Sequence, residues 1–438
     1  MSIAQMHGMN GTLCSCGKTH GFQVEVISGK GVISQIPELV ASYGAKKVYV
    51  LSDVNTQKAA GDQVCRLLDQ AGIVYINHCF QNETLEPDET SVGSAMMHYP
   101  LDADLILTVG SGVLNDIGKI VSAVSGKPYI IVATAPSMDG YASATSSMTR
   151  DGLKISLPSR SADVIVGDTE ILRQAPMDMM RSGLGDMLAK YVSICEWRIS
   201  QVITGEYYCE EIASLIRSAV KGCVDNAQGL LERQEAAVQA VFEGLVIGGV
   251  AMNYAGLSRP ASGVEHYISH VLDMRGAEFG TPVAFHGTQC AVGTLLAVRL
   301  YEKLANIPPN KEKALAHAKT FDYAAWSETL RGLLGKGAES MIALEQKEKK
   351  YDVSLHARRL EKILSNWEEI LEILRQELPG ADQLEKLLDE VQLPKSLQEL
   401  GTEESLFPTV FRTTADIRDK YVLSRLAWDL GITEELLK

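Results

Sequence analysis

The first 175 residues alternate between short apolar runs and longer amphipathic stretches. The runs are rich in β-branched residues and end at turn-forming or polar residues, as buried parallel strands do. They are Lys47–Ser52, Ile73–Ile76, Leu105–Val109, Tyr129–Ala133 and Val164–Val166. Helical patterns lie between them, such as Gln57–Ala71, which Gly72 closes. This alternation predicts an α/β domain whose parallel sheet is covered on both faces.

From about Met177 the pattern changes to long helical stretches. They include Met187–Arg198, Tyr208–Ala227, Glu235–Tyr254 and Val264–Asp273. We therefore predict an α/β dinucleotide-binding domain over residues 1–175 and an all-α metal and substrate domain over residues 176–438. The segment 339–397 is strongly charged and predicts solvent-exposed helices, for which a hairpin is one arrangement. We assign no chemistry to it.

Composition narrows the class of protein. A chain of 438 residues is larger than one compact core usually allows, which favours two domains. Its 46% hydrophobic and 22% charged residues exclude extended disorder over the whole length. The net charge of −14 repels phosphate backbones, so we expect no nucleic-acid partner. The same field slows an anionic substrate, so a phosphate pocket must carry its own local donors.

No apolar run approaches the length of a membrane span, and the N-terminus has neither the basic nor the apolar region of a secretory signal. We therefore expect a cytoplasmic protein without a membrane span. Its eight scattered cysteines predict reduced thiols. Cys14 and Cys16 with nearby His20 are candidate ligands for a soft metal, although a structural or incidental role explains three such residues better.

A glycine turn follows the strand Leu105–Val109. Small residues at Gly110, Ser111 and Gly112 let the backbone approach a pyrophosphate, which the N–H groups at the following helix start stabilise. The strict dinucleotide fingerprint has a third glycine at position 115, where this chain has Asn115, so an ordinary strand-to-helix turn explains the pattern as well.

Two further strand ends carry polar groups. Asp53 follows the strand Lys47–Ser52, where a carboxylate can accept hydrogen bonds from ribose hydroxyls and would repel the 2′-phosphate of NADP, which favours NAD. A helix cap is the common alternative for such an aspartate. The strand Tyr129–Ala133 is followed by Thr134, Ala135, Pro136 and Ser137, and then by Asp139 and Ser143. Ligands bind at this end of the strands in parallel sheets. A simple Pro-Ser turn is the alternative interpretation.

Histidines mark the second half of the chain. His266 and His270 are four residues apart on a predicted helix, which places both rings on one face, and His286 follows sixteen residues later. Asp186 lies just inside the first helix of the predicted second domain. Two imidazoles and a carboxylate suit a divalent first-row metal that acts as a Lewis acid. Separate core or surface histidines are the alternative, and spacing alone does not bring Asp186 to His266.

Three motifs occur in order: TAPSMDGYAS at Thr134–Ser143, GLGDMLAKY at Gly183–Tyr191 and SRPASGVEHYISH at Ser258–His270. With them, the chain from about Gly29 to Val298 resembles the glycerol-1-phosphate dehydrogenases, members of the iron-containing alcohol dehydrogenase and dehydroquinate synthase-like superfamily. The resemblance implies reversible hydride transfer between NAD(P)H and the phosphorylated triose dihydroxyacetone phosphate. It also implies a homodimer or larger homo-oligomer.

The resemblance further implies the roles of individual residues. Asp186, His266 and His286 would bind the catalytic Zn²⁺ or Ni²⁺, and Asp139, Asp186 and His270 would face the substrate, with Asp186 and His270 as the catalytic residues. The NAD(P) site would consist of Asp53, Gly112, Val113, Leu114, Asn115, Asp116, Thr134, Ala135, Pro136, Ser137 and Ser143. His270, one helical turn from His266, is positioned to pass a proton between the substrate oxygen and solvent.

Because the overall field is acidic, we hypothesise that Arg259 helps to bind the substrate phosphate; an arginine that braces its turn is the alternative. Three other functions stay open. One is a glycerol dehydrogenase acting on unphosphorylated polyols. Another is a dehydroquinate synthase-like lyase, in whose pattern a glutamate stands in place of Asp186. The third, of a different class, is a non-catalytic nucleotide-binding protein on the same scaffold.

Overall fold

The computed structural model describes residues 3–82, 84–150 and 153–438. They form two compact units. The first comprises Met1–Met187 and Ser214–Leu257, and the second comprises Leu188–Ala213 and Ser258–Lys438. The units are therefore interleaved along the chain, whereas the hydrophobic pattern predicts a single boundary after residue 175.

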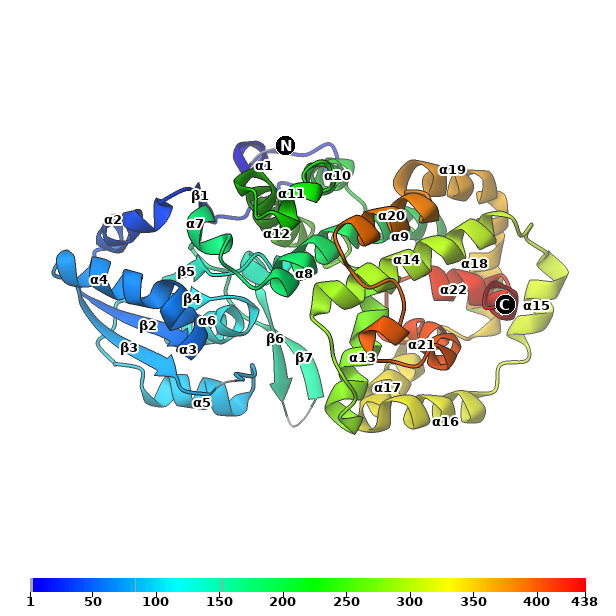
Figure 1. The fold of residues 1–438 in the computed structure, drawn as a ribbon. Coiled ribbons are helices and arrows are strands. Elements are labelled where there is room, and N and C mark those ends of the chain that lie inside the picture. The colour runs from blue at the N-terminus through cyan, green and yellow to red at the C-terminus, as the bar shows by residue number, and fades with distance from the viewer. Residues whose placement is uncertain (1–2, 83, 151–152) are drawn as a thin grey trace. The chain divides into compact units, whose positions relative to one another are not determined.

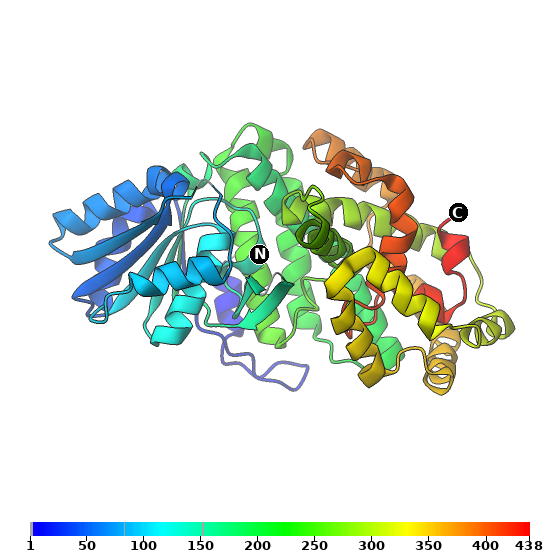
Figure 2. The ribbon, with the colours of Figure 1, turned by 90° about the horizontal axis from the view of Figure 1, so that it is seen from below.

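The first unit is built on a six-stranded sheet with the strand order β1-β8-β5-β4-β2-β3, and all of its pairs are parallel. Figures 1 and 2 show these strands side by side. Their bounds are β1 Glu25–Gly29, β2 Lys47–Asp53, β3 Val74–Phe80, β4 Leu105–Gly110, β5 Tyr129–Ala133 and β8 Val164–Asp168. The predicted fold class is confirmed, and every predicted strand overlaps one of these, although Ile73–Ile76 begins one residue before β3 and misses the second half of that strand.

Helices cover both faces of the sheet. The connections after β1 and β2 run toward one edge and those after β3 and β4 run back, so right-handed crossovers place their helices on opposite faces. Accordingly α2 (Ile36–Ser42) packs beside α4 (Asp62–Gln70), and α5 (Glu89–Met97) beside α6 (Gly112–Ser125). A core of fully buried aliphatic side chains, including Val48, Val50, Leu107, Ile130 and Val164, fills the space between helices and sheet.

Two features of the first unit lie outside the predicted pattern. β1 is an edge strand whose ends are polar and glycine residues, so no continuous apolar run marks it. A two-stranded antiparallel hairpin, β6 (Thr145–Arg150) and β7 (Leu153–Pro158), follows the Asp139–Tyr141 turn. Four of the six residues of β6 carry hydroxyl groups, which is why its sequence gives no strand signal.

The remaining helices of the first unit follow the sheet along the chain, apart from α1 and α3. They are α1 (Ile3–Met9), α3 (Val54–Thr56), α7 (Thr169–Leu172), α8 (Met177–Leu188), α10 (Glu210–Asp225, from Ser214), α11 (Gln228–Leu231) and α12 (Glu235–Ala255). The predicted helix Met187–Arg198 is wrong at its start, because α8 ends at Leu188 and α9 begins at Lys190.

Among the described residues, α12 alone is long and apolar enough to cross a membrane by length and composition, and 67% of its most apolar window is buried. This differs from our expectation that no segment approaches that length. The buried fraction is what a core helix shows, since apolar residues all round a helix are needed where it is packed on all sides.

The described residues of the second unit form helices joined by turns and loops, with no strand among them. Its helices are α9 (Lys190–Thr204), α13 (Val264–Phe279), α14 (His286–Ala305), α15 (Lys311–Ala318), α16 (Tyr323–Leu334), α17 (Ala338–Glu348), α18 (Val353–Ser365), α19 (Trp367–Glu377), α20 (Ala381–Glu390), α21 (Phe407–Thr414), α22 (Leu423–Asp429) and α23 (Thr433–Leu436). The α13–α14 pair is central, because α16, α20 and α21 all pack against it.

The charged segment 339–397 is only partly what we predicted. It is helical, but each of α18, α19 and α20 has one buried apolar stripe. The stripes contain Leu360, Ile363, Ile370, Ile373, Leu384 and Leu388, all at most 2% exposed. The charges therefore occupy only the outer faces of helices that pack into the second unit.

Candidate functional site

The neighbouring strands β2, β4 and β5 end in the same row, at the carboxyl edge of the sheet. Leu51 of β2 pairs with Thr108 of β4, and Gly110 pairs with Ala133 of β5. Asp53 and Gly110 each lie two residues beyond the first pair, so both fall in one row with Ala133. All predicted cofactor residues follow one of these strand ends, at the edge where parallel sheets bind ligands.

The start of α6 is shaped for an anion. Among the described residues, no side chain caps its first N–H groups, since the N-cap hydroxyl of Ser111 pairs with the hydroxyl of Ser137 at 2.6 Å. The N–H groups of Gly112, Val113 and Leu114 therefore stand at a helix start, where a phosphate is stabilised. A Cβ at Gly110 would lie 2.6 Å from the Cβ of Leu114, so the turn needs a glycine there.

Asn115 takes the place of the fingerprint's third glycine and is fully buried. Its amide Nδ2 donates to the carbonyl of Gly140 at 3.0 Å, and its Oδ1 accepts from the Tyr129 hydroxyl at 2.9 Å. Helix α6 approaches strand β4 closely about one turn after Asn115, at Gly118. A Cβ atom on Gly118 would lie 2.5 Å from the hydroxyl oxygen of Thr108, so this contact needs a glycine. Sequence reasoning did not single out Gly118, although a glycine inside an apolar helix was a readable signal.

Asp53 caps α3. Its Oδ1 accepts hydrogen bonds from the N–H groups of Asn55 and Thr56, at 2.9 and 2.7 Å. In turn, the hydroxyl oxygen of Thr56 accepts a hydrogen bond from the backbone N–H of Asp53. This is the capping alternative considered above. Since both bonds use one carboxylate oxygen, the cap is compatible with ribose binding by the other oxygen.

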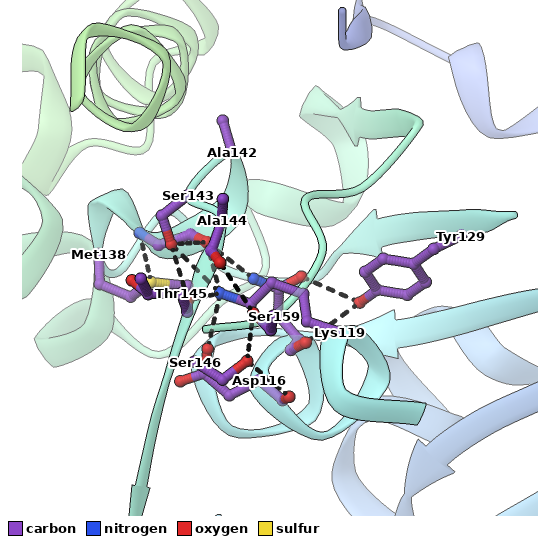
Figure 3. A network of polar contacts seen from close by, with 12 residues as sticks. Asp116, Lys119, Tyr129, Met138, Ala142, Ser143, Ala144, Thr145, Ser146 and Ser159 are labelled. Atoms are coloured by element: carbon purple, nitrogen blue, oxygen red, sulfur yellow. Dashed lines mark hydrogen bonds and ion pairs between the residues drawn. The ribbon is translucent and has the colours of Figure 1, made fainter. Parts of the chain in front are cut away.

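A buried lysine organises the segment after β5 (Figure 3). The ammonium group of Lys119, on α6, is 2.8 Å from the carboxylate of Asp116 and donates to the Gly140 carbonyl, the Ser143 hydroxyl and the Thr145 carbonyl, at 3.2, 3.2 and 2.5 Å. A fully buried ammonium group requires such pairing. Asp116 and Ser143, both predicted to contact the cofactor, thus belong to one network that Lys119 holds together. Sequence reasoning missed Lys119.

Within the first unit, two predicted substrate residues lie together. The fully buried carboxylate of Asp186, on α8, accepts a hydrogen bond from the backbone N–H of Asp139 at 3.0 Å. One turn earlier, a Cβ on Gly183 would fall 1.9 Å from the Pro136 carbonyl oxygen, so α8 approaches this loop as closely as a glycine allows. The motifs TAPSMDGYAS and GLGDMLAKY therefore meet through backbone contacts.

In the second unit, the three predicted histidines come together on α13 and α14. The ring centres of His266 and His286 are 5.0 Å apart, and those of His270 and His286 are 6.0 Å apart. The ligand atoms of His266, His286 and Cys290 all lie within 4.8 Å of one another. Asp186 belongs to the first unit, so its approach to these histidines stays a prediction.

Two residues beside the histidines were not predicted. The carboxylate of Glu265 accepts from Nδ1 of His266 at 2.8 Å, which directs Nε2 toward a metal and raises the basicity of the ligand. Burial by itself raises the pKa of the Cys290 thiol, but the imidazoles of His266 and His286 outweigh it and lower that pKa. Imidazole nitrogens with a carboxylate partner and a thiol form a donor set that suits Zn²⁺ or Ni²⁺.

Further charged groups lie near Glu265, among them the buried Glu196 and the partly buried Lys420. Burial, followed by the neighbouring Glu265, raises the pKa of Glu196, whose carboxylate accepts from the backbone N–H groups of Val264 and Leu423. Burial lowers the pKa of Lys420 to about 7, with nearby arginines adding to the shift. Glu196 thereby fixes the N-terminus of the helix that carries His266.

Arg259 is 1% exposed, and its guanidinium is surrounded by protein partners. Its Nε donates to the carboxylate of Glu206 at 2.9 Å, Nη1 to the Tyr421 carbonyl at 2.9 Å, and Nη2 to the Ser200 hydroxyl at 3.1 Å. These bonds favour the alternative in which Arg259 braces the turn before α13. Its predicted role toward a substrate phosphate is not tested by them.

Residues 27–176 match the family model of the iron-containing alcohol dehydrogenases. The chain is 33% identical over 298 residues to a glycerol-1-phosphate dehydrogenase (NAD(P)+) of Halalkalibacterium halodurans, covering 67% of this chain and 74% of that protein. It is also 33% identical to the protein of the same name from Methanosarcina mazei, over 63% of this chain and 76% of that one. The chain belongs to the glycerol-1-phosphate dehydrogenase family.

Solved structures agree on the fold of this glycerol-1-phosphate dehydrogenase family member. The glycerol dehydrogenase of Schizosaccharomyces pombe superposes with a TM-score of 0.61 at 17% identity, covering 94% of this chain and 89% of that one. A probable glycerol dehydrogenase of Sinorhizobium meliloti gives 0.60 at 17% identity, over 96% and 98%. At such identities the likeness establishes the fold alone.

Proposed function

We propose that this chain catalyses the reversible, NAD(P)-dependent reduction of dihydroxyacetone phosphate to sn-glycerol-1-phosphate. The observation that carries the proposal is the pairing of His266 with His286 in a family whose members bear that activity in their names. Two imidazoles side by side, one with a carboxylate behind it, are what a catalytic divalent metal needs from a helical unit.

The first unit would hold the cofactor. The turn from Gly112 to Asp116 would hold the pyrophosphate, through the N–H groups of Gly112, Val113 and Leu114 at the start of α6. The segment from Thr134 to Ser137, with Ser143, would line the nicotinamide end. Bound NAD(P)H supplies the hydride that reduces a carbonyl carbon. Asp53 favours NAD, because its carboxylate accepts from ribose hydroxyls and repels a 2′-phosphate.

Asp186, His266 and His286 would hold the metal, with the thiol of Cys290 beside them. A bound divalent metal supplies Lewis-acid polarisation of the substrate carbonyl and stabilises negative charge on its oxygen. The metal is Zn²⁺ or Ni²⁺ in this proposal. Glu265 keeps the proton on Nδ1 of His266, so that the other nitrogen presents its lone pair.

His270 would move the proton. It lies one helical turn from His266 and its ring centre is 6.0 Å from that of His286, so it can exchange a proton between the substrate oxygen and solvent. Asp139 would orient a substrate hydroxyl next to Asp186.

The variant Arg259→Ala tests the hypothesis that Arg259 binds the substrate phosphate. A larger rise in KM for dihydroxyacetone phosphate than for dihydroxyacetone supports the hypothesis. An equal change in both KM values supports a structural role of Arg259 in the turn before α13.

The decisive experiment follows NADH oxidation with dihydroxyacetone phosphate, with chiral analysis of the glycerol phosphate formed. Formation of sn-glycerol-1-phosphate is expected. Preference for unphosphorylated dihydroxyacetone would instead make the chain a glycerol dehydrogenase. Absence of bound divalent metal and of activity, even after Zn²⁺ or Ni²⁺ is added, would favour a non-catalytic nucleotide-binding protein.

The proposal also includes a cytoplasmic homodimer or larger homo-oligomer. Light scattering of the purified chain tests the assembly, since a monomer at micromolar concentration would contradict it.

A further inference from the structure

The segment before β1 contains a tight turn that the proposed function does not use. Leu13 and Thr19 form an isolated antiparallel bridge, and the N–H of Cys14 donates to the Lys18 carbonyl at 2.9 Å. Gly17 closes the turn with a φ of +81°, a conformation that favours glycine, and its N–H donates to the Cys14 carbonyl at 2.9 Å. The Cys14-Ser15-Cys16 sequence is thereby folded back over a few residues.

The turn gathers ligand atoms. The thiol sulfurs of Cys14 and Cys16 and a ring nitrogen of His20 lie within 4.8 Å of one another, and Sγ of Cys16 is 3.5 Å from Nε2 of His20. Ligands at Zn–S and Zn–N distances in a tetrahedron are about 3.3–3.8 Å apart. The thiol-to-imidazole separation therefore already fits a shared Zn²⁺.

The hydrogen bond of His20 selects its metal-binding nitrogen. Nδ1 lies 3.0 Å from the backbone carbonyl of Tyr254, at the end of α12, and His20 is 2% exposed. A carbonyl only accepts, so Nδ1 carries the proton and Nε2, the nitrogen facing Cys16, has the lone pair. A backbone carbonyl behind a histidine is the partner that metal-ligating imidazoles commonly have.

We propose that Cys14, Cys16 and His20 bind one Zn²⁺, which ties the segment before β1 to the end of α12, where the Tyr254 carbonyl holds His20. Two thiolates and one imidazole are the kind of ligands that structural zinc sites use. The site shares no residue with the histidine site of the second unit. None of the eight cysteines is in a disulfide within the described residues, so the thiols are in the state that zinc requires.

The test measures metal content and Co²⁺ spectra of the full-length chain in the His266→Ala/His286→Ala background, which removes the other site. We expect one Zn²⁺ per chain, and Co²⁺ in its place should give strong thiolate-to-metal charge-transfer absorption. Cys14→Ser/Cys16→Ser should lose both signals, and Cys65→Ser, a half-buried cysteine elsewhere in the first unit, should keep both.

A second pair of variants guards against misfolding. His20→Ala should lose the metal, and His20→Cys should keep it, because a third thiolate also binds Zn²⁺. Retention of one full equivalent of metal in Cys14→Ser/Cys16→Ser, or a Cys14–Cys16 disulfide in protein purified without oxygen, would overturn the proposal.

Discussion

The two units position their functional groups in different ways. In the first, the candidate cofactor residues follow strand ends, and backbone groups shape the site, such as the uncapped N–H of Gly112 and the Gly140 carbonyl that Asn115 and Lys119 hold. In the second, the histidines are held by buried ionisable side chains, notably Glu265 behind His266. A strand end can be located from a local pattern, whereas a pair of buried side chains depends on the packing of helices far apart in the chain.

If the second unit supplies the metal ligands, the largest effect is expected from His266→Ala. Loss of a ligand removes the charge stabilisation that a metal provides, so kcat/KM for dihydroxyacetone phosphate should fall about 10³-fold. Steady-state NADH oxidation measures it. His98→Ala, which removes an exposed histidine of the first unit, should leave the rate unchanged. A His266→Ala variant with near-wild-type activity would remove the second unit from the chemistry.

Glu265→Gln sharpens the role assigned to buried carboxylates. The amide is a weaker acceptor for Nδ1–H of His266, so the affinity for the metal should drop about 10–100-fold. Competition with a chromophoric chelator measures the change. Glu278→Gln, further along the same helix, is the matched control. Equal affinities in the two variants would mean that Glu265 serves only the start of α13, where its carboxylate accepts from the N–H of Gly263 at 2.7 Å.

Lys119→Met probes the first unit. The substitution removes the bonds that hold Gly140, Ser143 and Thr145 in place, and a lost buried hydrogen bond costs roughly 1–3 kcal/mol. We expect KM for NADH to rise about tenfold, while kcat at saturating NADH changes less. Lys58→Met, at an exposed lysine, is the control. An unchanged KM would show that this loop does not shape the cofactor site.

The smallest effect concerns pH. The pKa of Lys420 is lowered to about 7 in the folded chain from an unfolded value near 10.5. Between these values the unfolded chain binds more protons, so this residue makes the free energy of unfolding rise with pH above about 7 and leaves it nearly unchanged below that pH.

Lys420→Met should remove that rise. Relative to the variant, the wild type should gain on the order of 1 kcal/mol between pH 7 and pH 9. Urea unfolding at both pH values measures the difference. The exposed Lys336→Met should retain the wild-type slope. A slope shared by all three proteins would place the Lys420 ammonium in contact with solvent.

Much of the first unit could be predicted from the sequence. β5 has the predicted bounds, and the strands on β2, β4 and β8 could be predicted because a strand buried on both faces is continuously apolar. Only the first residues of β3 were predicted, because the polar residues Asn77 and His78 of this edge strand interrupt its apolar run. β6 could not be predicted, because its hydroxyl residues do not form the apolar pattern of a strand. Its strand conformation depends on pairing with β7.

The candidate site divides in the same way. His266 and His270 could be predicted because their spacing follows one helical turn, and the glycine turn because it follows a strand. Cys290 and Lys119 could not, because a lone cysteine or lysine inside a helix carries no signal until the packing shows what its side chain meets.

The sequence by itself determined the parallel strands, the glycine turn and the helical spacing of the histidines, since each follows from interactions between residues close in the chain. Tertiary structure decided which distant groups meet: Glu265 with Glu196, Asp186 with Asp139, and the helices from Ser214 to Leu257 with the sheet. Such contacts arise because buried charges and small residues find partners only when the whole unit has packed.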